Sequence, residues 1–389
     1  MLLGRIYTIR LNMKKIDWKK QYAKHPVWEW TVDIIGIGLL TILFSWIIVR
    51  TNFTGELFKS AAEIDTPELI DIYTISANNA NLKSQSDVVL MPIDGCSRHD
   101  LTTILQELHT LPVAAIGVDV TFPYPDSEDS TLLKAIKADK RIVMASRIGG
   151  SYFEEDLTDQ GVVFGSIQLN AKSRYDIVRT FTPTIIEAED TLPTFESQLA
   201  QLIRPQASAS FSPNKPSYIA YSRVLFDTIP AQTLLDEDFN RDNITERVEG
   251  KIVLLGDLEL INDTYRTPLQ ADMPGVVIHA YILDTILRDR IIKLLPLYAS
   301  WLIACLLAFG AAWGLLLLKW KASDAEGLLL RIAQIVFAFI IAVIGVLMFS
   351  DRDYYVNMEP VFFALAVLAV TLDIWVGIMK LVKHIFKLQ

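Results

Sequence analysis

The sequence predicts an α/β extracytoplasmic domain with a mainly parallel sheet flanked by helices, plus four transmembrane α-helices, one before the domain and three after it. Four apolar runs are each close to the ~20 residues that a helix needs to cross a bilayer, and they bracket a polar stretch at 51–296. Within that stretch, short apolar runs alternate with amphipathic segments, which is typical of parallel strand–helix–strand units. Four buried core helices of a soluble protein are the disfavoured alternative, because runs so long and so nearly free of charge are rare there.

The charges that flank the apolar runs predict the topology. Lys and Arg are concentrated before the first run, around the loop between the second and third, and after the fourth. This bias places both termini in the cytoplasm and the large domain outside. A cleaved signal peptide is the alternative for the first run, but no small-residue cleavage site follows Val49. The predicted segments are a basic cytoplasmic N-terminus at 1–31, transmembrane helices at 32–50, 297–318, 332–349 and 359–380, the extracytoplasmic domain at 51–296, a cytoplasmic loop at 319–331, an external loop at 350–358 and a cytoplasmic tail at 381–389.

The predicted domain is acidic and poor in cysteine. Residues 51–296 hold 36 Asp and Glu against 21 Lys and Arg, a net charge of −15. Such a surface argues against nucleic acid as a partner, because nucleic acid needs a basic face. Cys96 lies in the domain and Cys305 in a predicted span, so no bridge between them is expected. A domain of this size buries its own core without crosslinks, which fits a multi-pass protein of the bacterial inner membrane with a periplasmic or extracellular domain.

The first part of the domain is predicted to contain three strands and two helices in alternation. Residues 51–86 are predicted to be helical or irregular. Buried strands are then predicted at 87–94, 113–119 and 142–146 from their β-branched, apolar composition. Helical spacing of apolar residues predicts a helix after the first strand, with Ser97 or Asp100 as its cap, and another within 129–141.

The second part of the domain is less regular until its end. Strands are predicted at 161–167 and 177–182, and residues Leu192 to Leu202 predict a helix. Residues 204–217 are predicted to be a loop, with a further short strand at 218–221. The run 250–257 predicts another buried strand, and the segment from Met273 toward the second span predicts a helix.

Three of the predicted strands end in an aspartate: Asp94, Asp119 and Asp257. Ligands of open α/β sheets gather at the carboxyl edge, and carboxylate oxygens suit a divalent cation or a polar ligand. The alternative is that these side chains cap helices or bond loop amides. His279 is either a satisfied core residue or a pocket residue near Asp257. The sequence identifies no cofactor and leaves a metal open.

The sequence contains no complete catalytic set and therefore predicts a protein that is not an enzyme. Ser97, His99 and Asp100 are adjacent in sequence, but adjacency is not the geometry of a triad. No GxSxG, HExxH, CxxC or P-loop motif is present. One carboxylate, Asp373, lies in the fourth apolar run. It is expected either to make a polar contact with another helix or a partner subunit, or to reach toward the interface near Lys380.

Several of these stretches resemble the type-two CHASE domain, an extracellular sensory module of bacterial signalling proteins. They are DVVLMPIDG at 87–95, AAIGVDVTFPYPD at 114–126 and, most specifically, GKIVLLGDLELINDTYRTPLQADMPGVVIHAYILDTIL at 250–287. The resemblance covers roughly 55–295, and it adds Asp263, which precedes Thr267-Pro268, to the candidate ligand-binding residues. Relatives also have one span before the domain and three after it.

The chain departs from that family in two places. Relatives usually have a Trp- and Pro-rich turn before an Arg, whereas this chain has Cys96-Ser-Arg98-His-Asp100, so a ligand contact made by that turn is not carried over. Relatives also usually carry an output domain, such as a kinase or cyclase, after the last span, and here only KLVKHIFKLQ follows. The resemblance therefore implies a sensory fold in a stand-alone form, without a signalling enzyme on the same chain.

Two functions from different classes follow. The first is a membrane-bound sensory subunit that binds a ligand or partner outside the cell and signals through a separate effector protein. The second is a structural scaffold subunit of a bacterial envelope complex. Membrane lipid and a homo-oligomer are further expected partners, the latter from small residues in the second span. A transporter is disfavoured, because the spans show no paired repeats and few intramembrane charges.

Overall fold

The computed structural model describes residues 27–50, 68–80, 83–147, 151–171, 176–187, 190–206, 210–213, 215–236, 238–259, 263–321 and 326–385. Residues 1–26 and 386–389, which hold most of the predicted N-terminal segment and part of the predicted tail, lie outside the described residues. The chain divides into two compact units. The sheet domain comprises Phe58–Leu294 and Val346–Tyr355, and the helical unit comprises Met1–Leu57, Leu295–Gly345 and Val356–Gln389.

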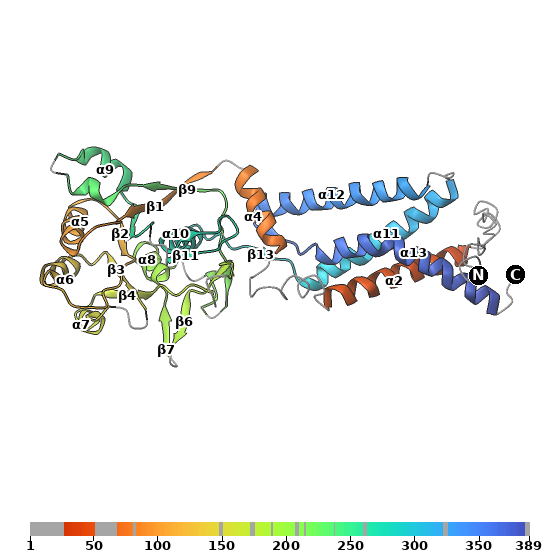
Figure 1. Ribbon diagram of the computed structural model, residues 1–389, viewed down its shortest axis with the longest axis horizontal. Coiled ribbons are helices and arrows are strands. Elements are labelled where there is room, and N and C mark those ends of the chain that lie inside the picture. The colour runs from red at the N-terminus through yellow and green to blue at the C-terminus, as the bar shows by residue number, and fades with distance from the viewer. Residues whose placement is uncertain are drawn as a thin grey trace, which may run out of the picture. The chain divides into compact units, whose positions relative to one another are not determined.

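The sheet domain is built on a six-stranded parallel sheet in the order β4-β3-β2-β10-β1-β9 (Figure 1). Every neighbouring pair runs parallel, which confirms the predicted parallel architecture. The strands are β1 Ser84–Pro92, β2 Ala115–Val118, β3 Ile142–Ser146, β4 Val163–Ser166, β9 Val224–Thr228 and β10 Ile252–Gly256.

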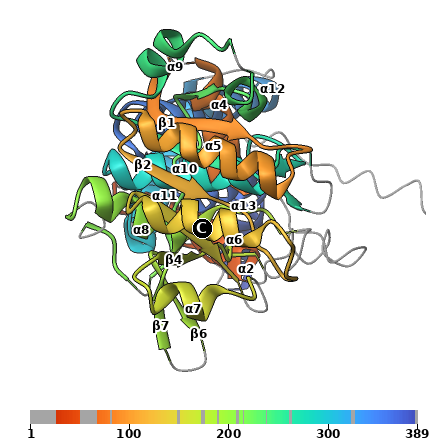
Figure 2. The ribbon, with the colours of Figure 1, turned by 90° about the vertical axis from the view of Figure 1, so that its left-hand side faces the viewer.

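Helices cover both faces of the sheet because successive strand residues point to opposite sides. In β1, Val88 and Leu90 enter one core cluster with residues of α8 and α10, whereas Val89 and Met91 enter a second with residues of α5 and α6. Figure 2 shows these helices on either side of the strands. The helices of the domain are α4 Leu69–Ala80, α5 Arg98–Thr110, α6 Asp129–Ala138, α7 Glu154–Thr158, α8 Phe195–Ile203, α9 Arg241–Val248 and α10 Gly275–Leu287, with the 3-10 helix η2 Ala231–Leu234.

The strands of the domain differ from the prediction in three places. Leu192 lies in β7 Asp190–Pro193, which forms an antiparallel hairpin with β6 Thr184–Glu187, so the helix begins only at Phe195. The predicted strand at 218–221 is limited to β8 Ser217–Tyr218, paired with β5 Thr180–Phe181. The edge strand β9 was not predicted, because a short strand paired on one side carries a weak pattern. Two further ladders join β11 Thr264–Tyr265 to β12 Met273–Pro274 and β13 Lys293–Leu294 to β14 Tyr354–Tyr355.

The helical unit contains α2 Val27–Arg50, α11 Leu297–Lys321 and α13 Glu359–Ile385, which pack against one another, and most of α12 Glu326–Arg352. Among the described residues, Thr31–Ile48 and Leu297–Gly314 are long and apolar enough to cross a membrane. A third span results if Glu359–Leu368 and Val370–Val382, bent by 48°, are counted as one. The apolar stretch Gln334–Ser350 is shorter. The structure therefore supports two or three of the four predicted spans.

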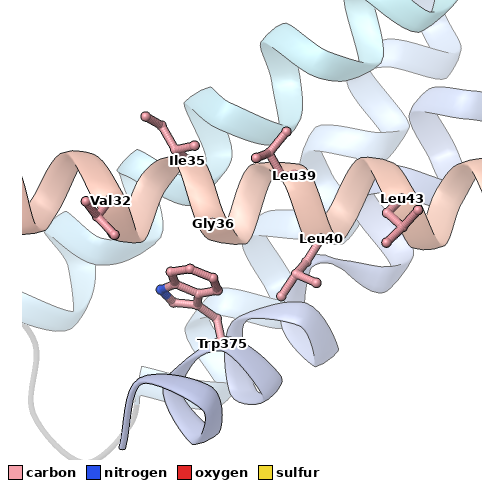
Figure 3. Close-up of a pocket in the computed structure, with 7 residues that line it drawn as sticks. All are labelled: Val32, Ile35, Gly36, Leu39, Leu40, Leu43 and Trp375. Carbon is pink, nitrogen blue, oxygen red and sulfur yellow. The ribbon is translucent and has the colours of Figure 1, made fainter. Parts of the chain in front are cut away.

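Polar contacts and one close approach hold α2 against α13. The hydroxyls of Thr41 and Thr371 lie 2.7 Å apart, and Trp375 Nε1 donates to Asp33 Oδ1 at 2.9 Å. The Trp375 indole lies directly against Gly36, where an added Cβ would come within 2.1 Å of the ring (Figure 3). Around this contact is an apolar hollow of about 340 Å³ lined by Val32, Ile35, Gly36, Leu39, Leu40, Leu43 and Trp375.

Candidate functional site

The predicted aspartates lie at the carboxyl edge of three adjacent strands. Asp119 directly follows β2, Asp257 directly follows β10, and Asp94 comes two residues after β1, in a sheet where β10 separates β2 from β1. Residues at this edge come together because parallel strands end on the same side. The loops that leave the strands nevertheless divide the aspartates between two groups.

The first group, Asp94 and Asp257, fastens the loop that follows β10. Asp94 Oδ1 accepts hydrogen bonds from the backbone amides of Leu258 at 2.9 Å and Glu259 at 2.7 Å, and Asp257 Oδ1 accepts from Glu259 N at 2.8 Å. Burial raises the pKa of Asp94, but hydrogen bonds from Asp257 and from these amides outweigh it and hold the pKa below its ordinary value. These contacts correspond to the alternative interpretation, in which strand-end carboxylates bond loop amides.

The second group is centred on His279, in the first turns of α10. His279 Nδ1 lies 2.6 Å from Glu196 Oε1, and each side chain is only 4% exposed. The ring of Phe195 meets the imidazole edge to face, with centroids 5.9 Å apart. Burial lowers the pKa of His279, but the negative charges of Glu196, Asp119 and Asp263 outweigh it and raise the pKa to about 9. At neutral pH the imidazole is therefore protonated and donates to Glu196.

Asp119 completes this group from the end of β2. Its backbone is held by a hydrogen bond from Asp119 N to Leu255 O at 2.8 Å. Burial raises the pKa of its carboxyl to about 6, and the carboxylates of Asp263 and Glu196 act in the same direction, against the opposing charge of His279. Asp119 thus shares one imidazolium with two other acidic side chains.

Asp263 reaches the group from the segment before β11. Its carboxylate lies over the first residue of α10, since a Cβ added at Gly275 would be 2.6 Å from Asp263 Oδ2. The Tyr265 hydroxyl donates to Asp263 Oδ1 at 3.3 Å. Burial raises the pKa of Asp263, while the charge of His279, the Tyr265 hydrogen bond and the charge of Arg147 oppose that rise. Gly275 is therefore the residue that allows a carboxylate to approach the helix N-terminus.

We name the four side chains Asp119, Glu196, Asp263 and His279 the edge site. Three carboxylates face one imidazolium, so the edge site has an excess of negative charge when all are ionised. Two of its members, Asp119 and Asp263, retain partial solvent exposure. The exposed Arg147 also acts on it, since its charge lowers the pKa of Asp263. The edge site can therefore accept hydrogen bonds from a ligand that carries positive charge or donor groups.

The other polar residues that the sequence singles out do not belong to the edge site. Within the described ranges, no three His, Cys, Asp or Glu side chains are placed to hold a metal ion. Ser97 and Asp100 form a capping box on α5, with Ser97 Oγ accepting from Asp100 N at 3.1 Å and Asp100 Oδ2 accepting from Ser97 N at 2.9 Å. This confirms the predicted cap.

Sequence reasoning missed Glu196 and the interhelical contact of Asp33 on α2. Glu196 lies in the first turn of α8, where an acidic residue is ordinary, and only its burial at 3% exposure distinguishes it. Asp373 is exposed on α13 and makes no hydrogen bond or ion pair within the part of the chain that the structure describes. The contact predicted for Asp373 with a partner subunit or the interface stays a prediction, and Asp33 makes a polar contact between α2 and α13 through Trp375.

Comparison with known proteins agrees with this architecture. The family model of the CHASE2 domain matches residues 31–318, which include the described parts of the sheet domain up to β13, nearly all of α2 and most of α11. The match is wider than the 55–295 of the resemblance noted in the sequence. Neither curated proteins nor solved structures returned a match. With a parallel sheet domain, apolar helices on both sides of it in sequence and a match over most of its length, the chain belongs to the CHASE2 domain family of extracytoplasmic sensory domains.

Proposed function

We propose that the chain is a membrane-bound sensory subunit, without enzymatic activity, that binds a ligand or partner at the edge site and signals through a separate effector protein. The observation that carries the proposal is the placement of Asp119, Asp263 and Glu196 around His279 at the carboxyl edge of the sheet. Sheets of this kind bind their ligands at that edge. Membership of a sensory family supplies the second support.

The chemistry of the edge site indicates the class of ligand. Burying a carboxyl such as that of Asp119 beside two acidic side chains that raise its pKa is unfavourable for folding, and proteins retain such groups mostly at functional sites. A ligand with an ammonium or guanidinium group would neutralise the excess negative charge and give Asp119 and Asp263 a cationic partner in addition to His279. We therefore propose a cationic or strongly hydrogen-bond-donating molecule, or a partner that presents such a group.

The proposed topology follows the charge pattern of the chain. We propose four spans in the bacterial inner membrane, with both termini cytoplasmic and the sheet domain periplasmic or extracellular; the two or three apolar helices long enough to cross a membrane and the distribution of Lys and Arg in the sequence are the support for it. Lipid then surrounds the helical unit. An effector helix or a second copy has room to pack on α11, since an added Cβ at Gly310 or Gly314 would meet nothing within 4 Å.

The first test is purification of the tagged full chain from its native host in mild detergent, followed by mass spectrometry. A stoichiometric partner with a kinase, cyclase, protease or similar effector domain would support sensing through a separate effector. Asp119→Asn and Asp263→Asn should then abolish the response of that effector while the partner is still recovered. Recovery of envelope structural proteins alone, with both substitutions silent, would instead favour the scaffold.

The second test addresses the ligand class directly. Spermidine, arginine, Mg²⁺ and acetate are added to the full chain in detergent, and unfolding of the sheet domain is followed. A binding cation at ~100 times its Kd should stabilise the wild type by about 2.7 kcal/mol. Asp263→Asn should remove that stabilisation, whereas the matched control Asp227→Asn, which breaks the Arg247–Asp227 pair elsewhere in the domain, should keep it. Stabilisation by acetate alone would contradict a cationic ligand.

A further inference from the structure

The turn between α12 and α13 is part of the sheet domain. Residues Val346–Tyr355 group with the domain rather than with the helical unit. Within this turn, β14 pairs with β13, aligning Lys293 with Tyr354, and Lys293 N donates to Asp353 O at 2.8 Å. Phe349 and Tyr355 pack on Tyr73 of α4, and their ring centroids lie 6.0 Å and 5.9 Å, respectively, from that of Tyr73. A segment that follows the sheet domain by about fifty residues in sequence is thus held by the domain itself.

Two arginines hold the turn through one carboxylate, and we name Arg223, Arg290 and Asp353 the turn clamp. Arg290 Nη2 lies 3.0 Å from Asp353 Oδ1, and its Nη1 donates to Ser222 O at 2.8 Å. Arg223 pairs with the same oxygen through Nη2 and donates to Ser350 O from Nη1 at 2.5 Å. Each guanidinium thereby makes two hydrogen bonds in different directions, which fixes its orientation.

The turn clamp combines backbone strain with an unsatisfied polar atom. In the described part of the chain, the non-glycine residues with positive φ are Arg223 at 69°, Asp289 at 52° and Asp353 at 53°. Two of them belong to the clamp, and the third immediately precedes Arg290. In addition, Arg223 Nε is buried and has no hydrogen-bond partner. Strained conformations persist only where neighbouring contacts impose them, and strain and unpaired donors are concentrated at elements that change state.

One buried helix joins the edge site to the turn clamp. α10 begins at Gly275, beneath Asp263, carries His279 in its first turns, and ends at Leu287. Arg290 follows three residues later, after Asp289 takes the left-handed conformation that terminates many helices. Residues Gly275 to Ile286 of α10 are buried apart from Val277. A helix of 13 residues is roughly 20 Å long and moves as one body, so a displacement at its first turns reaches its end.

We propose that α10 transmits a change at the edge site to the α12–α13 turn by moving Arg290 relative to Asp353. The domain thereby acts on the helices that enter and leave this turn, and not only through its own sequence connections to α2 and α11. This inference rests on the proposed function for its physiological trigger, but the mechanical connection that it describes is present without any ligand.

The experiment uses hydrogen–deuterium exchange of the full chain in detergent, read on peptides covering 346–358. Asp119→Asn perturbs the edge site, and Asp353→Asn opens the turn clamp. Asp119→Asn alone should change the exchange rate of the turn peptides at least threefold. In the Asp353→Asn background, the same substitution should change it less than 1.5-fold, because coupled sites are not additive. Arg290→Lys keeps the charge but loses the hydrogen bonds in two directions. In this background, the effect of Asp119→Asn on the exchange rate should lie between the effects in the wild-type and Asp353→Asn backgrounds.

A matched control variant and a check of the fold separate loss of coupling from general destabilisation. Asp227→Asn also breaks an Arg–Asp pair of the domain, with Arg247, and should leave exchange at 346–358 unchanged. Exchange in β10 identifies any variant that has lost its fold. Additive effects of Asp119→Asn and Asp353→Asn, or no effect of Asp119→Asn on the turn, would overturn the coupling. Failure of the proposed function would give a different result: no added cation would stabilise the sheet domain, while Asp119→Asn would still change the exchange of the turn.

Discussion

Replacing Asp119 by Asn should stabilise the sheet domain at neutral pH. The pKa of Asp119 rises from its ordinary 3.8 to about 6 because the carboxyl is buried beside Asp263 and Glu196. A carboxyl with a raised pKa in the folded state favours folding only while it is protonated. The stability that the protonated carboxyl contributes to the fold is therefore complete below pH 4 and is lost as the pH rises to 6. Asparagine resembles the protonated form at every pH.

The magnitude follows from the size of the pKa shift. At 1.36 kcal/mol per pKa unit, the rise to about 6 corresponds to ~3 kcal/mol of lost stability once the carboxylate is ionised. Asp119 keeps partial solvent exposure, so we reduce this to about 2 kcal/mol for Asp119→Asn at pH 7.5. A gain of this kind is expected where a site has been retained for function at the expense of stability.

The assay must report on the sheet domain within the full chain. None of the eight tryptophans lies in 51–296, so tryptophan fluorescence reports mainly on the helices. Pulse proteolysis in urea, with the domain fragment quantified on a gel, measures its free energy of unfolding in detergent. The variant should exceed the wild type at pH 7.5 and match it at pH 4. A variant that is less stable than the wild type at pH 7.5 would refute the reasoning, because Asp119 would then be a structural residue.

Three further outcomes are expected. His279 has a pKa raised to about 9, so the stability that its protonated form contributes is complete below pH 6.5 and is lost as the pH rises to 9. In the same proteolysis assay, the free energy of unfolding of the wild type should therefore fall by up to about 3 kcal/mol over this pH range, and His279→Gln should remove that fall. Asp94→Ala leaves the Leu258 amide without its acceptor and the Glu259 amide with Asp257 alone, and it should cost about 1–3 kcal/mol, with faster deuterium exchange at 257–259 and unchanged exchange at 263–279. Gly36→Val would place atoms within 2.1 Å of the Trp375 ring and should cost about 1–3 kcal/mol in the helical unit, with an altered tryptophan emission spectrum; an unchanged spectrum would contradict the close contact between these two residues.

The sequence by itself determined the class of the domain and many of its elements. Apolar runs such as 250–257 and 113–119 predict buried parallel strands because a strand covered on both faces needs apolar side chains throughout. A helix cap at Ser97 or Asp100 was also predicted from local sequence, and the structure shows that the two residues form a capping box together, since they lie within four residues of each other. The candidates Asp119, Asp263 and His279 also followed from local pattern and from the resemblance to a sensory family.

Only the tertiary structure decided which of these residues meet. Asp94, Asp119 and Asp257 end neighbouring strands, yet the path of the following loop gives Asp94 and Asp257 the amides of Leu258 and Glu259, while Asp119 is left with His279. Glu196 joins His279 across 83 positions of sequence, because α8 and α10 pack on the same face of the sheet. The turn clamp likewise joins Arg223 and Arg290 to a carboxylate beyond two apolar helices. Contacts of this kind depend on packing between elements, which the periodicity of any single element does not encode.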